Sequence, residues 1–248
     1  MARPGIALQL YTVREEARTD FVGTLRRVAA IGYAGVELAG TGGLAAGALR
    51  RVLADLGLAV AGAHVSLDRL EGALEAELEY HAALGNATLV CPALPPARRH
   101  ADGYRQAAAS LAAIGRRCRE RGLRFAYHNH AFEFERAGER TALEILLEES
   151  DPAAVEWEPD VYWIAAAGEE PAAWLRRYAG RCRLIHLKDM TAGSPPTYAE
   201  VGEGILDFAP IFAATADADW YIVEQDACVR PPLESAALSL RHLRAWGR

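Results

Sequence analysis

The strongest constraint on the fold is an eightfold alternation of two kinds of segment. Short runs rich in β-branched and other apolar residues alternate with longer stretches in which apolar residues recur at helical spacing. The expected strands are residues 6–10, 34–38, 58–64, 87–91, 123–127, 154–160, 183–187 and 220–224. The expected helices are residues 20–31, 44–56, 68–84, 101–121, 141–149, 170–178, a helix that begins at Asp207, and residues 235–246. Eight such pairs predict a closed parallel α/β barrel.

The length of the chain agrees with this repeat. A (β/α)8 barrel typically takes about 250 residues as one domain, and the chain has 248. Its hydrophobic fraction of 51% suits a large buried core. We therefore expect one TIM-barrel domain of the α/β class over residues 1–248.

Composition argues against several classes of function. The net charge of -6 opposes the cationic surface that nucleic-acid binders need. No apolar run reaches the roughly 18 residues required to span a bilayer, and residues 1–5 lead directly into the first strand, without room for a secretory signal. We expect a cytoplasmic protein that acts on a small molecule, with no nucleic-acid or membrane partner. The sequence leaves open whether it forms a homo-oligomer.

Two histidines follow the fifth expected strand closely, in the sequence Tyr127-His128-Asn129-His130. Because side chains alternate along a strand, His128 and His130 share a face. Two imidazoles on one face indicate a metal or proton-transfer site, although they would also serve to cap a core strand by bonding nearby backbone.

Polar side chains gather at the ends of the other expected strands, where TIM barrels place their chemistry. The strand-end residues are Gln9, Tyr11, Glu37, His64, His128, Asn129, His130, Asp160, His186, Lys188 and Glu224. Asp160, His186 and Glu224 come from successive strands and offer oxygen, nitrogen and oxygen ligands. Each alone would also be explained by an ion pair. Together they suit one divalent metal ion, Mn²⁺, Mg²⁺, Co²⁺ or Zn²⁺, with a fourth ligand from the fifth strand.

The sixth strand does not fit a simple alternation. Glu156, Glu158 and Asp160 would share one face, and three inward carboxylates are costly to bury unpaired. We expect only Asp160 to face the mouth of the barrel, with an irregular start to the strand or with Glu156 and Glu158 paired to Arg.

Several motifs from the first strand to the eighth together carry a resemblance. They are residues 8–14, 127–130, 132–134, 160–163, 185–189, 201–204 and 223–226. With these motifs the chain resembles the xylose isomerase-like TIM-barrel superfamily. Within it, the chain is similar to the sugar phosphate isomerase/epimerase branch, also described as AP endonuclease family 2.

The resemblance implies a metal site. In that superfamily Glu, Asp, His and Glu from strands five to eight commonly hold one divalent metal, and Asp160, His186 and Glu224 match the last three. His128 stands where the strand-five Glu would be, so the fourth ligand is either His128 or Glu133 from the following loop. We favour His128 because strand ends hold geometry better than loops.

The resemblance also implies an activity. The expected enzyme acts on a sugar or sugar phosphate, removes the proton next to a carbonyl through a metal-stabilised enediolate, and is an isomerase or epimerase. Loss of a β-hydroxyl from the same intermediate would make it an inosose or 3-keto-sugar dehydratase, a lyase. The expected acids, bases and electrophiles are Glu133, His130, His64 and Lys188. The expected substrate-binding residues are Gln9, Tyr11, Glu37, Asn129 and Glu203.

Lys188 is the sole lysine among 27 basic residues, the others being Arg. Lys188 is two residues after His186, and side chains alternate along a strand, so we expect both on the same side of the strand. A lone lysine indicates a role that the planar guanidinium cannot fill, such as proton transfer or contact with an oxyanion. The alternative is an ion pair with Asp189.

Two hypotheses of other classes remain. An AP endonuclease would need additional His and Glu ligands for three zinc ions and a basic DNA-binding face, which the net charge and the seven His oppose. A metal-free binding module without catalysis is the other, and metal analysis of the purified protein separates it.

Overall fold

Eight parallel strands form one sheet in the computed structural model, which describes residues 3–248. They are β1 (Gly5–Gln9), β2 (Gly35–Leu38), β3 (Ala59–His64), β4 (Thr88–Cys91), β5 (Arg124–His128), β8 (Glu156–Glu158), β9 (Leu184–Leu187) and β12 (Trp220–Val223). Seven of the strands begin and end within one residue of their expected ranges, and β8 is shorter than its expected range by two residues at each end. The predicted (β/α)8 TIM barrel is confirmed. Met1 and Ala2, part of the segment that carries the expectation about a secretory signal, lie outside the described residues.

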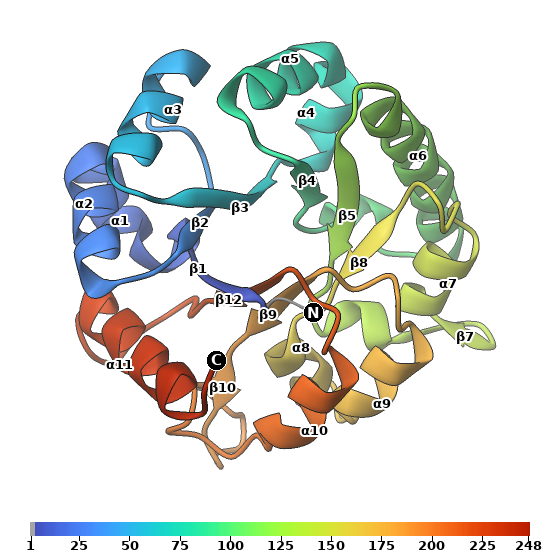
Figure 1. Cartoon of the computed structure of the whole chain (residues 1–248). Helices are drawn as coiled ribbons and strands as arrows, with labels where there is room; N and C mark the ends of the chain where they lie inside the picture. The colour runs from blue at the N-terminus through green and yellow to red at the C-terminus, as the bar shows by residue number, and fades with distance from the viewer. Residues whose placement is uncertain (1–2) are drawn as a thin grey trace.

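Helices cover the outside of the barrel in chain order (Figure 1). They are α1 (Arg14–Thr19), α2 (Phe21–Ile31), α3 (Ala46–Asp55), α4 (Leu67–Gly72), α5 (Leu74–Leu84), α6 (Ala101–Glu120), α7 (Ala142–Glu148), α8 (Val161–Ala166), α9 (Pro171–Arg177), α10 (Phe208–Ala214) and α11 (Pro232–Ala245). Asp20 caps α2 by accepting a bond from the Gly23 backbone. The sequence did not predict α1 or α8, because six residues give little periodic signal. It also joined α4 and α5, which separate at Ala73.

Short elements occupy several of the loops that follow the barrel strands. The 3-10 turns are η1 (Leu10–Val13), η2 (Pro96–Arg98) and η3 (Phe132–Phe134). The strands β6 (Arg136–Ala137) and β7 (Arg140–Thr141) form one antiparallel pair, and β10 (Asp189–Met190) and β11 (Tyr198–Ala199) form another. The second pair lies in the long segment that follows β9.

The barrel closes between β8 and β9, which end the strand order β8-β5-β4-β3-β2-β1-β12-β9. A parallel bridge between Asp160 and His186 joins them. The His186 backbone donates to the Pro159 carbonyl at 2.9 Å, and the Trp157 backbone donates to the Arg181 carbonyl at 2.9 Å. We call this junction the closing seam, and it places two expected metal ligands side by side.

The inside of the barrel is built in layers. A buried apolar layer consists of Ala7, Ala61, Val90, Ala126, Leu184 and Ile222. Two residues further along four of these strands stand buried polar side chains, Gln9, His128, His186 and Glu224. Because residues two apart on a strand point to the same side, this polar layer rests directly on the apolar one.

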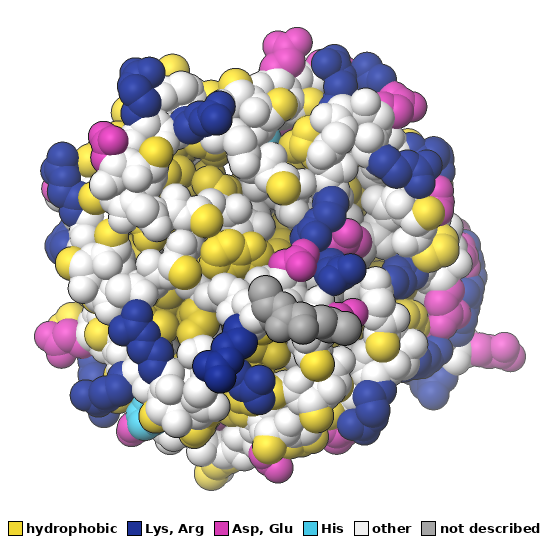
Figure 2. Space-filling view, in the orientation of Figure 1, with side chains coloured by type: hydrophobic (Ala, Val, Ile, Leu, Met, Phe, Trp, Pro, Cys, Tyr) yellow, Lys and Arg dark blue, Asp and Glu magenta, His cyan; other side chains and the backbone are white. Residues whose placement is uncertain are grey.

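One end of the barrel is largely apolar at its centre. Figure 2 shows hydrophobic side chains at the middle of this face, with basic and acidic side chains directly beside them and around the rim, and little His surface. Within residues 3–248, no helix combines the length and the apolar character needed to cross a membrane.

The segment after β9 is held to the barrel by the buried carboxylate of Asp189. This carboxylate accepts backbone bonds from Met190 at 2.8 Å, Gly202 at 3.0 Å, Gly204 at 3.0 Å and Leu206 at 3.1 Å. A Cβ on Gly204 would lie 2.3 Å from Asp189 Oδ1, so only glycine allows this approach. Asp189 therefore fixes the turn that follows β11.

Replacing Asp189 with Ala should destabilise the fold strongly. Four backbone N–H groups would lose their acceptor, and we expect the free energy of unfolding in urea to fall by about 2 to 4 kcal/mol. The matched control is Asp207→Ala, which removes an exposed cap of α10 that bonds the Ala209 backbone. That change should cost about 1 kcal/mol. Equal losses in the two variants would contradict the anchoring role.

Candidate metal and catalytic centre

Four expected ligands converge at the strand ends. His128 ends β5, Asp160 follows β8, His186 lies in β9, and Glu224 follows β12. All four are buried, and one ligand atom of each lies within 4.8 Å of the others. His186 Nδ1 is 2.9 Å from Glu224 Oε2, and His128 Nε2 is 3.7 Å from Asp160 Oδ2. We call these residues the four-ligand group; their role as metal ligands stays a prediction.

The second nitrogen of each imidazole faces a deeper carboxylate. His128 Nδ1 is 3.1 Å from Glu158 Oε2, and His186 Nε2 is 2.6 Å from Glu37 Oε2. Such a carboxylate fixes the orientation of a metal-binding imidazole and its tautomer. Two imidazole nitrogens and two carboxylate oxygens, with the rings held in this way, fit a divalent metal ion.

Glu158 is a hub that the sequence did not predict. Its Oε2 is 2.9 Å from His64 Nε2 and 3.3 Å from His186 Nε2, and the side chain is fully buried. The expectation that only Asp160 faces the mouth is therefore wrong, because imidazoles rather than Arg compensate the carboxylate. Glu156 does pair with Arg, its Oε1 being 3.5 Å from Arg124 Nε. Glu158 and Asp160 are two residues apart, so the alternation of side chains along a strand could have predicted that both face inward.

The buried carboxylates have different pKa values. Burial raises the pKa of Glu158 to about 7, and the neighbouring Glu37 carboxylate adds to this rise. Burial also opposes ionisation of Glu37 and Glu224. The imidazoles of His64 and His186 nevertheless lower the pKa of Glu37, and the Lys188 ammonium lowers that of Glu224. These neighbours therefore favour the ionised forms of Glu37 and Glu224.

Two of the imidazoles, those of His128 and His130, are uncharged. Burial, with His186 and His64 nearby, holds the pKa of His128 well below its usual range. Burial lowers the pKa of His130 to about 3, with the Lys188 charge as the next cause. Both rings are neutral near pH 7, which is the form that binds a metal or accepts a proton.

Lys188 is buried at the centre of the cluster, 1% exposed. Its Nζ lies 2.9 Å from Asp160 Oδ2, 2.8 Å from Glu224 Oε2 and 3.1 Å from Asp226 Oδ2. Burial opposes its charge, but the Asp160 and Glu224 carboxylates raise its pKa well above the usual range. Lys188 shares the side of His186, as its parity predicts, and the alternative pairing with Asp189 is wrong.

His64 and His130 lie at the edge of the cluster. The ring centroid of each is 5.2 Å from that of His128, and both are less buried than the four-ligand group. His64 lines a cavity of about 470 Å³. On the other side, Trp163 packs 5.4 Å from the His130 ring and lines a cavity of about 530 Å³. These cavities border the cluster.

Glu133, expected as a catalytic base or as the alternative ligand, lies apart from the cluster. Its buried carboxylate accepts the Tyr127 hydroxyl at 2.6 Å and the His130 backbone at 2.8 Å. Tyr127 has the opposite parity to His128, so this pair lies on the outer side of β5. The structure therefore favours His128 over Glu133 as the strand-five member of the site.

Three residues expected to bind substrate hydroxyls have protein partners instead. Asn129 Oδ1 accepts the Trp157 indole at 2.9 Å and the Asp160 backbone at 3.0 Å. Gln9, which is fully buried, donates to Glu37 Oε2 at 2.8 Å. Gln9 and Glu37 thus position the cluster from within the barrel. Asn129, which shares the parity of Tyr127, supports it from the outer side of β5.

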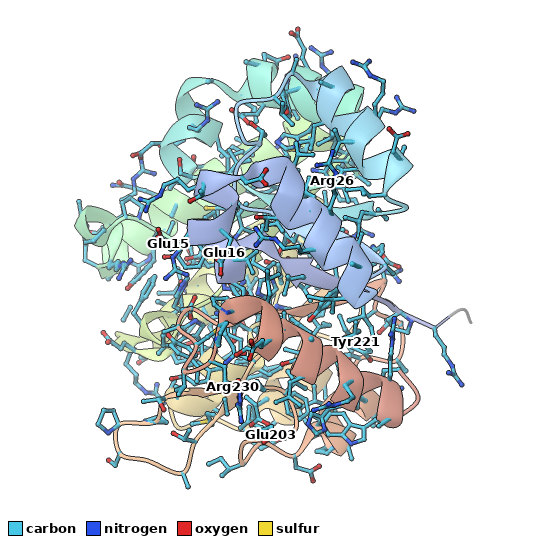
Figure 3. The ribbon with its side chains drawn as sticks, turned by 90° about the vertical axis from the view of Figure 1, so that its left-hand side faces the viewer. Glu15, Glu16, Arg26, Glu203, Tyr221 and Arg230 are labelled. Atoms are coloured by element: carbon cyan, nitrogen blue, oxygen red, sulfur yellow. The ribbon has the colours of Figure 1, made fainter. Side chains whose placement is uncertain are left out.

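Tyr11 and Glu203 complete the expected binding residues. Tyr11 is 43% exposed beside the cluster end of β1, with Arg14 stacked on its ring at 4.2 Å. Glu203 instead lies beside α11, where it is 2.9 Å from His242 Nε2 (Figure 3). Figure 3 also shows Arg230 on this side, 2.9 Å from Glu200. The structure does not bring Glu203 to the cluster.

Comparison with known proteins places the chain in a family. Residues 25–246 match the model of the xylose isomerase-like TIM barrel. The chain belongs to this family. An inosose dehydratase of Geobacillus kaustophilus is 31% identical over 147 residues, which are 51% of this chain and 47% of the relative. The chain spans about half the length of the curated relatives it matches.

Solved structures of other xylose isomerase-like barrels agree with the fold. A sugar phosphate isomerase/epimerase from Parabacteroides distasonis superposes with a TM-score of 0.83 at 24% identity, covering 99% of this chain and 95% of the other. An L-ribulose 3-epimerase superposes with a TM-score of 0.75 at 18% identity, covering 99% and 94%. At these identities the likeness shows the fold alone, and the family match over residues 25–246 is what confirms the resemblance to the xylose isomerase-like superfamily.

Glu224→Gln should reduce metal binding, because it removes a ligand charge while keeping the side-chain shape. We expect the metal content, measured by elemental analysis, to fall below about one per chain, and the rise in Tm on addition of Mn²⁺ to shrink. Glu203→Gln is the matched control and should change neither. If both quantities are unchanged in Glu224→Gln, Glu224 is not a ligand.

A pair of histidine variants tests the same group. His128→Ala should weaken metal binding, because its Nε2 faces Asp160. His130→Ala should spare it, because the ring lies at the edge of the cluster. The reverse pattern would mean that His130, and not His128, is the ligand from the fifth strand.

Glu133→Gln should change how stability depends on pH. Burial raises the pKa of Glu133 from 4.5 to about 7, so the unfolded chain releases this proton first as pH rises. The contribution of Glu133 is therefore fully present below pH 4.5 and is lost as pH rises through about 7. The free energy of unfolding of Glu133→Gln, relative to wild type, should rise by about 3 kcal/mol over this range. A difference that stays constant in urea unfolding across these pH values would contradict the assignment.

Proposed function

We propose that the protein is a divalent-metal-dependent isomerase or epimerase of a sugar or sugar phosphate, which removes the proton next to a carbonyl. The observation that carries the proposal is the four-ligand group at the ends of four strands, with Lys188 among its carboxylates. The names of the sugar phosphate isomerase/epimerase and L-ribulose 3-epimerase structures support the substrate class. A divalent metal held by this group would supply a Lewis acid that polarises the carbonyl and makes the neighbouring proton more acidic.

His64 and His130 are the groups best placed to exchange protons with the substrate. Both rings flank His128. His64 lines one cavity, and Trp163, which packs on the His130 ring, lines the other. Epimerisation requires a proton to leave one face of a carbon and another to arrive on the opposite face, so two acid-base groups around one site suit it. His130 Nδ1 is buried and has no hydrogen-bond partner among residues 3–248, which leaves it available to a ligand.

Lys188 has a different part in this proposal. Its ammonium links Asp160 to Glu224 and so fixes two members of the four-ligand group. A compact cation at this place also lies close enough to stabilise negative charge that develops on a substrate oxygen. Its burial among three carboxylates prevents it from moving away into solvent.

A lyase is the second candidate, because curated relatives with 27% to 31% identity are named inosose dehydratases. Dehydration begins with the same proton removal. The group that would return a proton to the opposite face instead protonates a hydroxyl as it leaves the next carbon. The same residues therefore serve either outcome, and the position of the acid relative to the substrate decides between them.

Incubation of the metal-loaded protein in D2O with ketoses, ketose phosphates, inososes and 3-keto sugars tests the proposal. An isomerase or epimerase puts deuterium into a product of unchanged composition, which NMR detects. A lyase releases water and forms a conjugated ketone, which absorbs in the ultraviolet. Binding without exchange would indicate a non-catalytic module, cleavage of abasic DNA would indicate an endonuclease, and either result would overturn the proposal.

Lys188→Arg should lower turnover by about a hundredfold while the protein stays folded and binds metal. The reason is geometric: an ammonium fits among the three surrounding carboxylates, whereas a planar guanidinium cannot hold the same point position. Turnover is measured on the substrate that the D2O screen identifies. Arg230→Lys, which keeps charge beside Glu200 away from the cluster, is the control. Near wild-type turnover in Lys188→Arg would show that positive charge alone is sufficient.

A further inference from the structure

The larger of the two cavities that border the cluster is lined by aromatic rings. Its volume is about 530 Å³, and Tyr162, Trp163 and Tyr198 form its wall. The ring centroids of Tyr162 and Tyr198 are 4.6 Å apart at 31°, and those of Trp163 and Tyr198 are 6.1 Å apart at 84°. We call these three residues the aromatic corner. Pro196 and Val229, the latter 96% exposed, extend the apolar lining of the cavity.

The aromatic corner is continuous with the catalytic cluster. The Trp163 ring centroid is 5.6 Å from Lys188 Nζ and 5.4 Å from the His130 ring. Burial and the neighbouring Asp226 carboxylate raise the pKa of Tyr198, and Asp226 Oδ2 is 3.1 Å from Lys188 Nζ. A molecule that reacts beside His130 and Lys188 therefore has the aromatic corner as the neighbouring surface for whatever is attached to it.

The chemistry of this surface selects an uncharged group with a flat face. Within the described part of the chain, no residue that lines the cavity carries a charged side chain, and Lys188 is already held by three carboxylates. A phosphate placed here would lose water without gaining a free cation. Tyr and Trp rings instead bind apolar ring faces and present polar edges to hydroxyls.

We propose that the aromatic corner binds a second ring, joined by a glycosidic bond to the sugar that reacts at the cluster. The substrate is then a glycoside, not a free sugar or a sugar phosphate. This inference rests on the proposed function and narrows its substrate class. We place the anomeric carbon of the reacting sugar in this bond. That carbon then cannot open to a carbonyl, so the carbonyl next to the exchanged proton is a ketone on the sugar ring.

Calorimetric binding to the metal-loaded full chain tests the subsite. The probes are methyl 3-keto-β-D-glucopyranoside, the corresponding phenyl glycoside and 3-keto-cellobiose. We expect the wild type to bind the phenyl glycoside or the disaccharide derivative at least about tenfold more tightly than the methyl glycoside, the scale of one aromatic contact. Whichever of the two is tighter identifies the second ring as aromatic or as a sugar.

Two variants of one residue separate the ring from its hydroxyl. Tyr198→Ala should abolish the preference for the larger glycosides, whereas Tyr198→Phe, which removes only the hydroxyl and keeps the ring that packs on Tyr162 and Trp163, should retain it. Thermal unfolding of both variants checks that they are folded. Equal wild-type affinities for methyl and phenyl glycosides, or a preference that survives in Tyr198→Ala, would overturn the subsite while leaving the proposed function in place. If no probe and no free ketose binds or exchanges its proton, the proposed function fails, and the subsite with it.

Discussion

The structure depends on burying several charged groups at one end of a parallel barrel. Glu37, Glu158, Asp160 and Glu224 are all buried, and within residues 3–248 Lys188 is the one ammonium among them, in contact with Asp160 and Glu224. A buried charge is tolerated only when it is paired and hydrogen-bonded, and even then it contributes little to stability. The apolar layer below and the surrounding helices must therefore supply the stability of the barrel. The cluster is better explained by chemistry than by folding.

The residues that close the barrel also hold the ligands of the site in place. β8 is a three-residue strand, and its neighbour β9 is reached through the Asp160–His186 bridge. Asn129 holds the same junction from β5 by accepting bonds from Trp157 and from the Asp160 backbone. Displacement of any of these strand ends would therefore move two members of the four-ligand group. This coupling gives the ligands the rigid support that precise coordination requires.

The order of the elements and the place of the cluster follow from the sequence because both rest on simple periodicities. Strand runs alternate with helical runs, and side chains two apart share a face, so parity alone places His186 and Lys188 on one side of their strand. Such patterns do not predict which residues become the hydrogen-bond or ion-pair partners of a buried polar group. Glu158 faces inward because three imidazoles from different strands meet it, and Glu133 turns outward because Tyr127 offers a hydroxyl there. Most of these contacts join segments distant in the chain, so local spacing could not predict them.

Charge balance explains why the donor set suits a divalent cation. Four buried carboxylates face one ammonium, and the pKa shifts show how the structure offsets the excess negative charge. Glu158 has its pKa raised to about 7 by burial and by Glu37. Burial opposes a charge on His186, yet Glu158 and Glu37 raise its pKa well above the usual range. Bound protons thus supply positive charge at the places where carboxylates crowd together. A divalent ion on the four-ligand group would supply the same compensation, so the electrostatics and the donor atoms favour the same kind of ligand.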